Sequence, residues 1–178
     1  QDGDPDVIVA LQARSSVALI ENSGAGAFQP PRMVEAFSCP SHADAGDLDQ
    51  DGIVDLVALG SGTGDVALLR VLWGDRSGDF ERTWISSDAR GPRHAVLADL
   101  DGDGDPDLAV ANGSSSTVSL FWNQGVRVLE PEVQLPVGAG PCQVIAADVD
   151  GDGRLDLATA DEGSGTVSIL HNSGQGQF

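Results

Sequence analysis

Apolar and polar residues alternate along most of this chain with a period of two residues. The segments HAVLADL (residues 94–100), DLAVAN (107–112) and TVSLFWN (117–123) are short, rich in valine and leucine, and bounded by Gly, Asn, Ser or Pro. Such segments are typical of β-strands joined by tight turns. A longer apolar run over residues 126–138 completes a set of four, and we find no 3.6-residue period of a helix. The pattern therefore predicts an all-β fold of short antiparallel strands.

This set of strands recurs at a nearly constant spacing. Asp2, Asp51, Asp103 and Asp152 each precede a glycine in an acidic segment, and they lie 49, 52 and 49 residues apart. A fixed period near 50 residues indicates a repeat architecture, and four antiparallel strands per repeat are typical of β-propeller blades. The three extra residues of the longer spacing lie near GSGTG (residues 60–64), in a loop that tolerates insertion. A β-sandwich is the alternative, but it has no reason to repeat at a fixed period.

The phase of the repeat also predicts the blade boundaries. It divides the chain into a partial blade over residues 1–38, complete blades over 39–90 and 91–139, and a second partial blade over 140–178. Three, four, four and three strands are expected, or about 3.5 blades. We therefore expect a segment of a larger propeller, whose remaining blades come from a longer chain or from another subunit.

Composition and charge limit the classes of function. The 178 residues include 28 Asp or Glu but only 9 Lys or Arg, all of them arginine, which gives a net charge of −19. This charge repels a phosphate backbone, so no nucleic-acid partner is expected. No apolar run is long enough to span a membrane. The two cysteines and three histidines lack zinc-site spacing, and whether Cys39 and Cys142 pair remains open.

The acidic residues are concentrated in a way that indicates cation binding. Thirteen of the 28 lie in DLDQDGIVDL from Asp47, DLDGDGDPDL from Asp99 and DVDGDGRLDL from Asp148. Carboxylates about 5 Å apart repel by about 3 kcal/mol per pair at an effective dielectric constant near 20, so an ordered empty loop is costly. Calcium takes six to eight oxygen ligands and relieves that repulsion. An EF-hand is not expected, because position 12 of these segments is Ala58, Val110 or Thr159 instead of glutamate.

The segment from Asp99 shows how such a loop can surround a cation. Its positions 1, 3 and 5 are Asp99, Asp101 and Asp103, which converge if the backbone curls. A glycine at position 6 permits the tight bend. Position 7 then offers a main-chain carbonyl, and Asp107 at position 9 closes the ligand shell.

The motif D-x-D-x-D-G-x-x-D-L between two strands, followed by a proline-led entry to the next unit, resembles the FG-GAP and VCBS repeats of integrin α-subunit propellers and of many secreted bacterial proteins. The resemblance covers essentially the whole chain. It implies calcium in each loop, seven blades as the usual number, and adhesion or ligand binding outside the cell. Neither an FG nor a GAP sequence is present, which points to the bacterial branch of the family.

Carried over by position, the family's calcium ligands fall on three complete loops and one truncated loop. The complete sets are Asp47, Asp49, Asp51, Ile53 and Asp55; Asp99, Asp101, Asp103, Asp105 and Asp107; and Asp148, Asp150, Asp152, Arg154 and Asp156. Ile53, Asp105 and Arg154 contribute main-chain carbonyls. The truncated loop retains Asp2, Asp4 and Asp6, and its site is expected to be weak or vacant.

The favoured function is a non-catalytic, calcium-stabilised module for protein binding or cell adhesion, secreted or at the cell surface. A lectin-type propeller and a propeller polysaccharide lyase are the alternatives, but we find no catalytic set of side chains outside the loops. The partner, a protein or a glycan, is expected on the face opposite the calcium loops. Trp73 and Trp122 are expected to pack between blades, His42 and His94 to line turns with satisfied hydrogen bonds, and His171 to be partly exposed.

Overall fold

The computed structural model describes residues 4–178, in which fourteen β-strands and two short 3-10 turns are present. The strands form four antiparallel sheets, which we call blades 1 to 4 in chain order. Blade 1 contains β1 (Val7–Leu11), β2 (Ser16–Ile20) and β3 (Arg32–Glu35); blade 2 contains β4 (Pro40–Gly46), β5 (Asp55–Ser61), β6 (Ala67–Gly74) and β7 (Phe80–Ile85). Blade 3 contains β8 (Pro92–Ala98), β9 (Asp107–Asn112), β10 (Thr117–Phe121) and β11 (Val133–Pro136); blade 4 contains β12 (Pro141–Ala147), β13 (Asp156–Asp161) and β14 (Thr166–Leu170).

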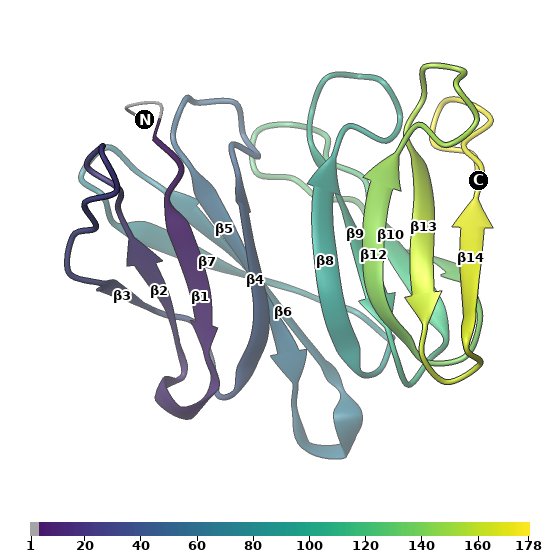
Figure 1. The fold of residues 1–178 in the computed structure, drawn as a ribbon, viewed down its shortest axis with the longest axis horizontal. Coiled ribbons are helices and arrows are strands. Elements are labelled where there is room, and N and C mark those ends of the chain that lie inside the picture. Colours follow the sequence, from purple (N-terminus) through teal and green to yellow (C-terminus); the bar gives the residue numbers. More distant parts are fainter. Residues whose placement is uncertain (1–3) are drawn as a thin grey trace.

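The blades lie side by side in chain order (Figure 1). Within each blade, strands consecutive in sequence are hydrogen-bonded neighbours. β4, β8 and β12 contact one another in turn and form the inner edge of the array. The 3-10 turns, Gln12–Arg14 and Thr63–Asp65, lie in hairpin connections, and the second coincides with the insertion expected in blade 2. The prediction of an all-β fold with propeller-like blades is confirmed.

The hydrophobic core consists of layers between neighbouring blades. Successive residues of β5 point to opposite faces: Leu56 and Ala58 pack toward blade 1, whereas Val57 and Leu59 pack toward blade 3. The residues of β9, in blade 3, alternate in the same way between a face that packs toward blade 2 and a face that packs toward blade 4. The period of two therefore places apolar residues on both faces of the second strand, and blades 2 and 3 are each covered on two sides.

The outer faces of blades 1 and 4 are less well covered. In blade 1, Val7 and Val9 are 39% and 38% exposed, and in blade 4 Ile145 and Val167 are 50% and 69% exposed.

No helix within residues 4–178 is long and apolar enough to cross a membrane.

Candidate metal sites in the acidic loops

Each complete acidic segment is the turn of a hairpin that joins the inner strand of a blade to its second strand. We call these the blade-2 loop (residues 47–55), the blade-3 loop (99–107) and the blade-4 loop (148–156). They emerge at the same end of the molecule, at the top of Figure 1. The glycine at position 6 has a positive φ in every loop, where another residue would be strained: 85° at Gly52, 98° at Gly104 and 89° at Gly153.

The carboxylate at position 1 folds each loop back on itself. It accepts a hydrogen bond from the amide of the glycine at position 6, so the loop closes around its own first side chain. The donor and acceptor pairs are Gly52 to Asp47 at 2.9 Å, Gly104 to Asp99 at 3.1 Å and Gly153 to Asp148 at 2.9 Å.

The carboxylate at position 9 anchors the loop to its blade. Asp55, Asp107 and Asp156 are each at most 1% exposed. Each accepts one hydrogen bond from the amide at position 2 of its own loop and one from an amide at the end of the third strand. These side chains therefore connect three strands of a blade, and they lie at the base of the loop.

Burial and hydrogen bonds shift the pKa values of these anchoring carboxyls in different directions. Burial raises the pKa of Asp55, and it raises the pKa of Asp107 to about 6, because the charged form is poorly solvated. The hydrogen bond from the Asn172 amide lowers the pKa of Asp156. A cation beside Asp55 or Asp107 would favour the charged carboxylate that burial disfavours.

Carboxylate oxygens from separate positions converge in all three loops. In each set below, one donor atom from each residue lies within 4.8 Å of the others. The blade-2 and blade-3 sets use positions 1, 3 and 9, and two overlapping sets occur in blade 4. The sets are Asp47, Asp49 and Asp55; Asp99, Asp101 and Asp107; Asp148, Asp150 and Asp152; and Asp150, Asp156 and His171.

Position 5 differs between the loops. Asp51 and Asp103 lie outside the converging sets of blades 2 and 3, whereas Asp152 belongs to one in blade 4. In all three loops the carboxylate at position 5 accepts a hydrogen bond from the amide at position 7, at 2.8 Å from Ile53 and at 2.9 Å from Asp105 and Arg154. Coordination by the carbonyl at position 7, including that of Arg154, stays a prediction.

The truncated loop keeps only part of this arrangement. Asp2 lies outside the described residues. Asp6 accepts a hydrogen bond from the Asn22 amide at 2.8 Å, the bond that position 9 accepts in the complete loops. Asp4 and Asp6 are exposed. Asp6 stands at position 9, like Asp107, but unlike Asp107 it is not buried.

Asparagine side chains bind the blade-2 and blade-3 loops to the following blade, and the sequence analysis missed them. Nδ2 of Asn123 donates to the carbonyl of Leu48, in the blade-2 loop, at 2.7 Å. Nδ2 of Asn172 donates to the carbonyl of Leu100, in the blade-3 loop, at 2.6 Å. Both asparagines are buried. The sequence did contain a pattern that could have revealed them. The same position of the repeat is asparagine in three of the four units, at Asn22, Asn123 and Asn172, and glycine in the other, at Gly74.

An arginine from blade 3 reaches the blade-2 loop and was also missed. Arg127 Nε donates to Asp49 Oδ2 at 2.6 Å, and Nη1 lies 3.1 Å from Glu81 Oε2. The hydrogen bond with Asp49 raises the pKa of Arg127. Arg127 has a φ of 65°, a left-handed backbone conformation that is unfavourable for residues other than glycine. The other repeats have glycine in this phase, at Gly26, Gly78 and Gly176.

The expectation for His42 and His94 is wrong. They lie in the inner strands β4 and β8 instead of in turns, and their rings stack with centroids 4.3 Å apart. His42 Nε2 and His94 Nδ1 are buried without a hydrogen-bond partner. Burial lowers the pKa of both. Cys39 and Cys142 are free cysteines, so no disulfide joins them.

Comparison with protein families agrees with these repeated loops. A family described as FG-GAP-like repeat matches residues 1–58, 47–110 and 99–159. The chain belongs to the FG-GAP-like repeat family. Successive matches overlap at the blade-2 and blade-3 loops, so the acidic segments recur in phase with the family repeat. A search of curated proteins found no match to this chain.

Two solved structures are similar to this chain, and the first has the same fold. A lectin from Agrocybe aegerita that recognises non-reducing terminal N-acetylglucosamine is 18% identical, with a TM-score of 0.58, over 98% of this chain and 50% of its own. A functionally unknown protein from Desulfotomaculum acetoxidans DSM 771 is 17% identical, with a TM-score of 0.39, over 97% of this chain and 70% of its own. The FG-GAP-like chain thus spans half the length of the lectin, and that likeness shows the fold.

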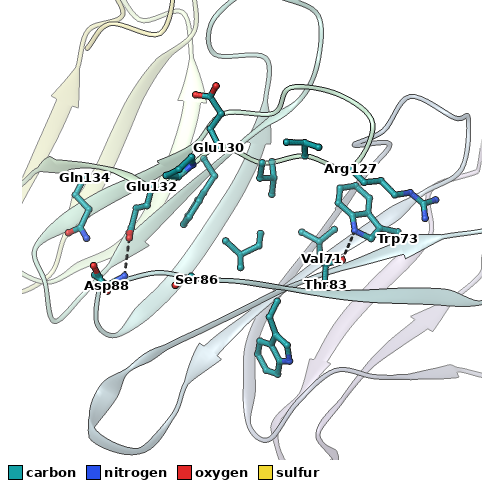
Figure 2. A pocket seen from close by; sticks show the side chains of 15 residues that line it. Val71, Trp73, Thr83, Ser86, Asp88, Arg127, Glu130, Glu132 and Gln134 are labelled. Atoms are coloured by element: carbon teal, nitrogen blue, oxygen red, sulfur yellow. Dashed lines mark hydrogen bonds between the residues drawn. The ribbon is translucent and has the colours of Figure 1, made fainter.

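Outside the loops, FG-GAP-like blades 2 and 3 enclose a groove of about 620 Å³ (Figure 2). Trp73 lies in it but is only 2% exposed and donates to Thr83 Oγ1 at 3.0 Å, so it packs between blades as expected. Trp84, also in the lining, is 53% exposed. Glu130 and Glu132 supply carboxylates to the lining. The groove therefore offers hydrogen-bonding groups, whereas the Trp84 ring lies on the opposite face of blade 2, with Arg70 Cζ 3.8 Å from its centroid and the Phe37 ring 5.6 Å away.

Proposed function

We propose that this FG-GAP-like chain is a non-catalytic binding module that acts outside the cell and is stabilised by calcium in the loops of blades 2, 3 and 4. The observation that carries this proposal is the convergence of three carboxylates in each loop, at positions 1, 3 and 9 in blades 2 and 3 and at positions 1, 3 and 5 in blade 4. In the blade-3 loop, for example, Asp99, Asp101 and Asp107 offer oxygens within 4.8 Å of one another, and Asp107 is buried. Such a cluster repels itself unless a cation is bound.

Calcium suits the chemistry of these donors. The converging sets of blades 2 and 3 contain only carboxylate oxygens. Calcium prefers oxygen and accepts six to eight ligands in flexible geometry, so main-chain carbonyls and water can complete the shell. Each calcium ion also neutralises two of the charges that contribute to the net charge of −19. Weak calcium sites of this kind suit an extracellular module, where the free ion is abundant.

The proposed partner is a protein that binds the face opposite the calcium loops. Connections on that face, at residues 61–64, 113–116 and 163–165, differ in sequence from blade to blade, whereas the acidic loops repeat. Variable loops on a constant scaffold are where binding specificity usually lies. A lyase is the least favoured alternative, and turnover assays on acidic polysaccharides test it.

Carbohydrate binding is the second candidate function, and the groove between blades 2 and 3 favours it. Glu130 and Glu132 in its lining offer acceptors for hydroxyl groups, and the groove has a volume of about 620 Å³. The similar lectin named above supports the idea through its fold alone. A glycan array separates the two functions: a specific glycan signal that Glu130→Gln removes would favour the lectin.

The outer faces of the array indicate further blades. Val7 and Val9 on one side, and Ile145 and Val167 on the other, leave apolar surface exposed. We propose that blades from a longer chain or another subunit cover these faces, because a β-propeller blade is normally packed between two others.

Calcium titration tests the central proposal. The chain is freed of metal with a chelator, titrated with calcium chloride by calorimetry, and melted with and without calcium. We expect calcium binding and a higher melting temperature. Asp99→Asn should weaken one site, whereas Asp88→Asn, an exposed acid outside the loops, should not. A wild-type chain that neither binds calcium nor gains thermal stability would refute the proposal.

A further inference from the structure

The outer strand of blade 2 differs from those of blades 1 and 3. β7 has six residues and no proline, whereas β3 and β11 have four residues each. β3 directly follows Pro31, and β11 ends on Pro136. Within residues 4–178, β7 pairs only with β6, so its other edge is unpaired. Proteins keep exposed edge strands short or interrupt them with proline, because an open edge can pair with another chain. β7 is therefore a strand to which a further strand can be added.

An aromatic and cationic patch lies beside this edge. Trp84 is 53% exposed, and Arg70 Cζ lies 3.8 Å from the centroid of its ring. The Phe37 ring packs against the same indole, with centroids 5.6 Å apart. Arg82 precedes Trp84 by two residues, so both side chains extend from the same face of β7. Tryptophan and arginine are enriched among the residues that contribute most to binding at protein interfaces.

The two guanidinium groups of this patch are incompletely neutralised. Glu35 Oε2 lies 3.5 Å from Arg82 Nη2. Arg70 Nε is buried without a hydrogen-bond partner among the described residues, and burial, together with the charge of Arg82, lowers the pKa of Arg70. Glu81 is on the other face of β7, where it pairs with Arg127 at 3.1 Å. A further carboxylate beside Arg82 would offset the repulsion between the two guanidinium groups.

The patch is specific to blade 2. Arg70 and Trp84 lie directly opposite each other on β6 and β7. The corresponding pairs are Ala18 and Met33 in blade 1, and Ser119 and Gln134 in blade 3. Positions that differ between otherwise repeated units are where binding specificity usually lies. The patch also lies between blades 1 and 2, so blades added beyond blade 1 or blade 4 would leave it accessible.

We propose that β7 is a docking edge for an extended segment of a partner protein, which places a carboxylate beside Arg82 and an apolar side chain against Trp84. In such strand addition, main-chain hydrogen bonds supply affinity and alternate side chains supply specificity. Phe37 lies in the connection that enters β4 at the end opposite the blade-2 loop, so the patch adjoins the face proposed for the partner. The inference rests on the proposed function in one respect, namely that the chain binds a protein.

The present ion pair of Arg82 does not block such a partner. The side chains of Arg82 and Glu35 are 44% and 74% exposed, and an exposed ion pair contributes little to stability. The net charge of −19 opposes an acidic partner at long range. Charges farther away than about 8 Å are, however, largely screened at physiological ionic strength. The groups around Arg82 therefore decide whether a carboxylate binds.

Two synthetic peptides test the docking edge. In both, every second residue is threonine; the residues between are alternately glutamate and isoleucine in the first peptide, and alternately glutamine and isoleucine in the second. Each carries fluorescein, and fluorescence anisotropy measures binding to the calcium-saturated chain. We expect the glutamate peptide to bind about tenfold more tightly, because a hydrogen bond to a charged group replaces a neutral one. Hydrogen–deuterium exchange should slow in residues 80–85 and not in β3 or β11.

Variants of the chain identify the residues involved. Arg82→Gln should weaken binding of the glutamate peptide to the level of the glutamine peptide. Glu35→Gln should strengthen it, because the variant removes the competing carboxylate. Arg93→Gln is the matched control, since Arg93 pairs with Glu162 at 3.0 Å outside the patch, and it should change neither affinity. The replaced side chains are exposed, so we expect all three variants to melt at the wild-type temperature.

Several results would overturn this inference. They are equal affinities for the two peptides, no binding of either, or slowed exchange in strands other than β7. Exchange in β7 that slows with rising chain concentration would instead assign the edge to a second copy of this chain. Binding of alginate that depends on Arg82, without binding of either peptide, would assign the patch to an acidic polysaccharide.

The calcium proposal is tested separately. If calcium binds and stabilises the chain while neither peptide binds, the docking edge is refuted and the calcium proposal stands. If the glutamate peptide binds β7 while calcium neither binds nor stabilises the chain, the calcium proposal fails and the docking edge stands.

Discussion

Replacing Arg127 by glycine removes a guanidinium that competes with calcium in the blade-2 loop. Arg127 Nε lies 2.6 Å from Asp49 Oδ2, and Nη2 lies 4.0 Å from Asp51 Oδ2. The Asp49 side chain is only 7% exposed, so water screens this ion pair poorly. Glycine is the residue that the other three repeats have in this phase, so Arg127→Gly restores the common pattern.

The size of the effect follows from these contacts. A hydrogen bond to a charged group contributes about 1.5–3 kcal/mol, and calcium bound by Asp49 must replace it. Without Arg127, calcium should therefore bind the blade-2 loop about 10- to 100-fold more tightly. Stability without calcium should change less, because Arg127 has a φ of 65°. Relief of a left-handed backbone gains about 1–2 kcal/mol, which offsets much of the lost ion pair.

Calorimetric titration of the metal-free chain measures the change. Arg93→Ala is the matched control, because it removes the same charge from a pair with Glu162 (3.0 Å) that lies outside the loops. We expect Arg127→Gly to strengthen one calcium site and Arg93→Ala to strengthen none. Identical calcium affinities in the two variants would refute the idea that Arg127 competes for Asp49.

Three further predictions follow from the structure. Asn123→Ala should lower the free energy of unfolding by about 2–4 kcal/mol in urea titrations, because it leaves two buried carbonyls without donors; a loss below about 0.5 kcal/mol would contradict this role. Asp103→Ala should weaken calcium binding more than Asp105→Ala, since only the first variant removes a proposed carboxylate ligand; equal losses would show that the assignment of positions 5 and 7 is wrong. The free energy of unfolding should fall as the pH drops below about 6.5, the ordinary pKa of histidine. Burial lowers the pKa values of His42 and His94, so the unfolded chain binds more protons than the folded chain in this range. Urea midpoints at pH 7.5 and 5.5 measure this fall, and the double replacement by glutamine should reduce it.

Features that arise from local chemistry could be predicted from the sequence. The period of two specified strands, and the recurrence near 50 residues specified blades. The acidic loops were predictable because their shape depends on residues within nine positions: an aspartate at position 1 that captures the amide at position 6, and a glycine that permits a positive φ. Position 9 was also visible in the sequence, although its burial and its second hydrogen bond were not.

The side chains that reach a loop from distant parts of the chain could be identified from the folded structure but not from the sequence. Arg127 lies 78 residues from Asp49, and Asn123 lies 75 residues from Leu48. His171 meets Asp150 because strand pairing brings the end of β14 beside the start of β13, and His42 meets His94 because two inner strands are neighbours. Such contacts depend on how blades and strands pack, which spacing along the chain does not encode residue by residue. Loops that share one acidic motif thereby acquire different surroundings: a guanidinium from the next blade in blade 2 and an imidazole in blade 4.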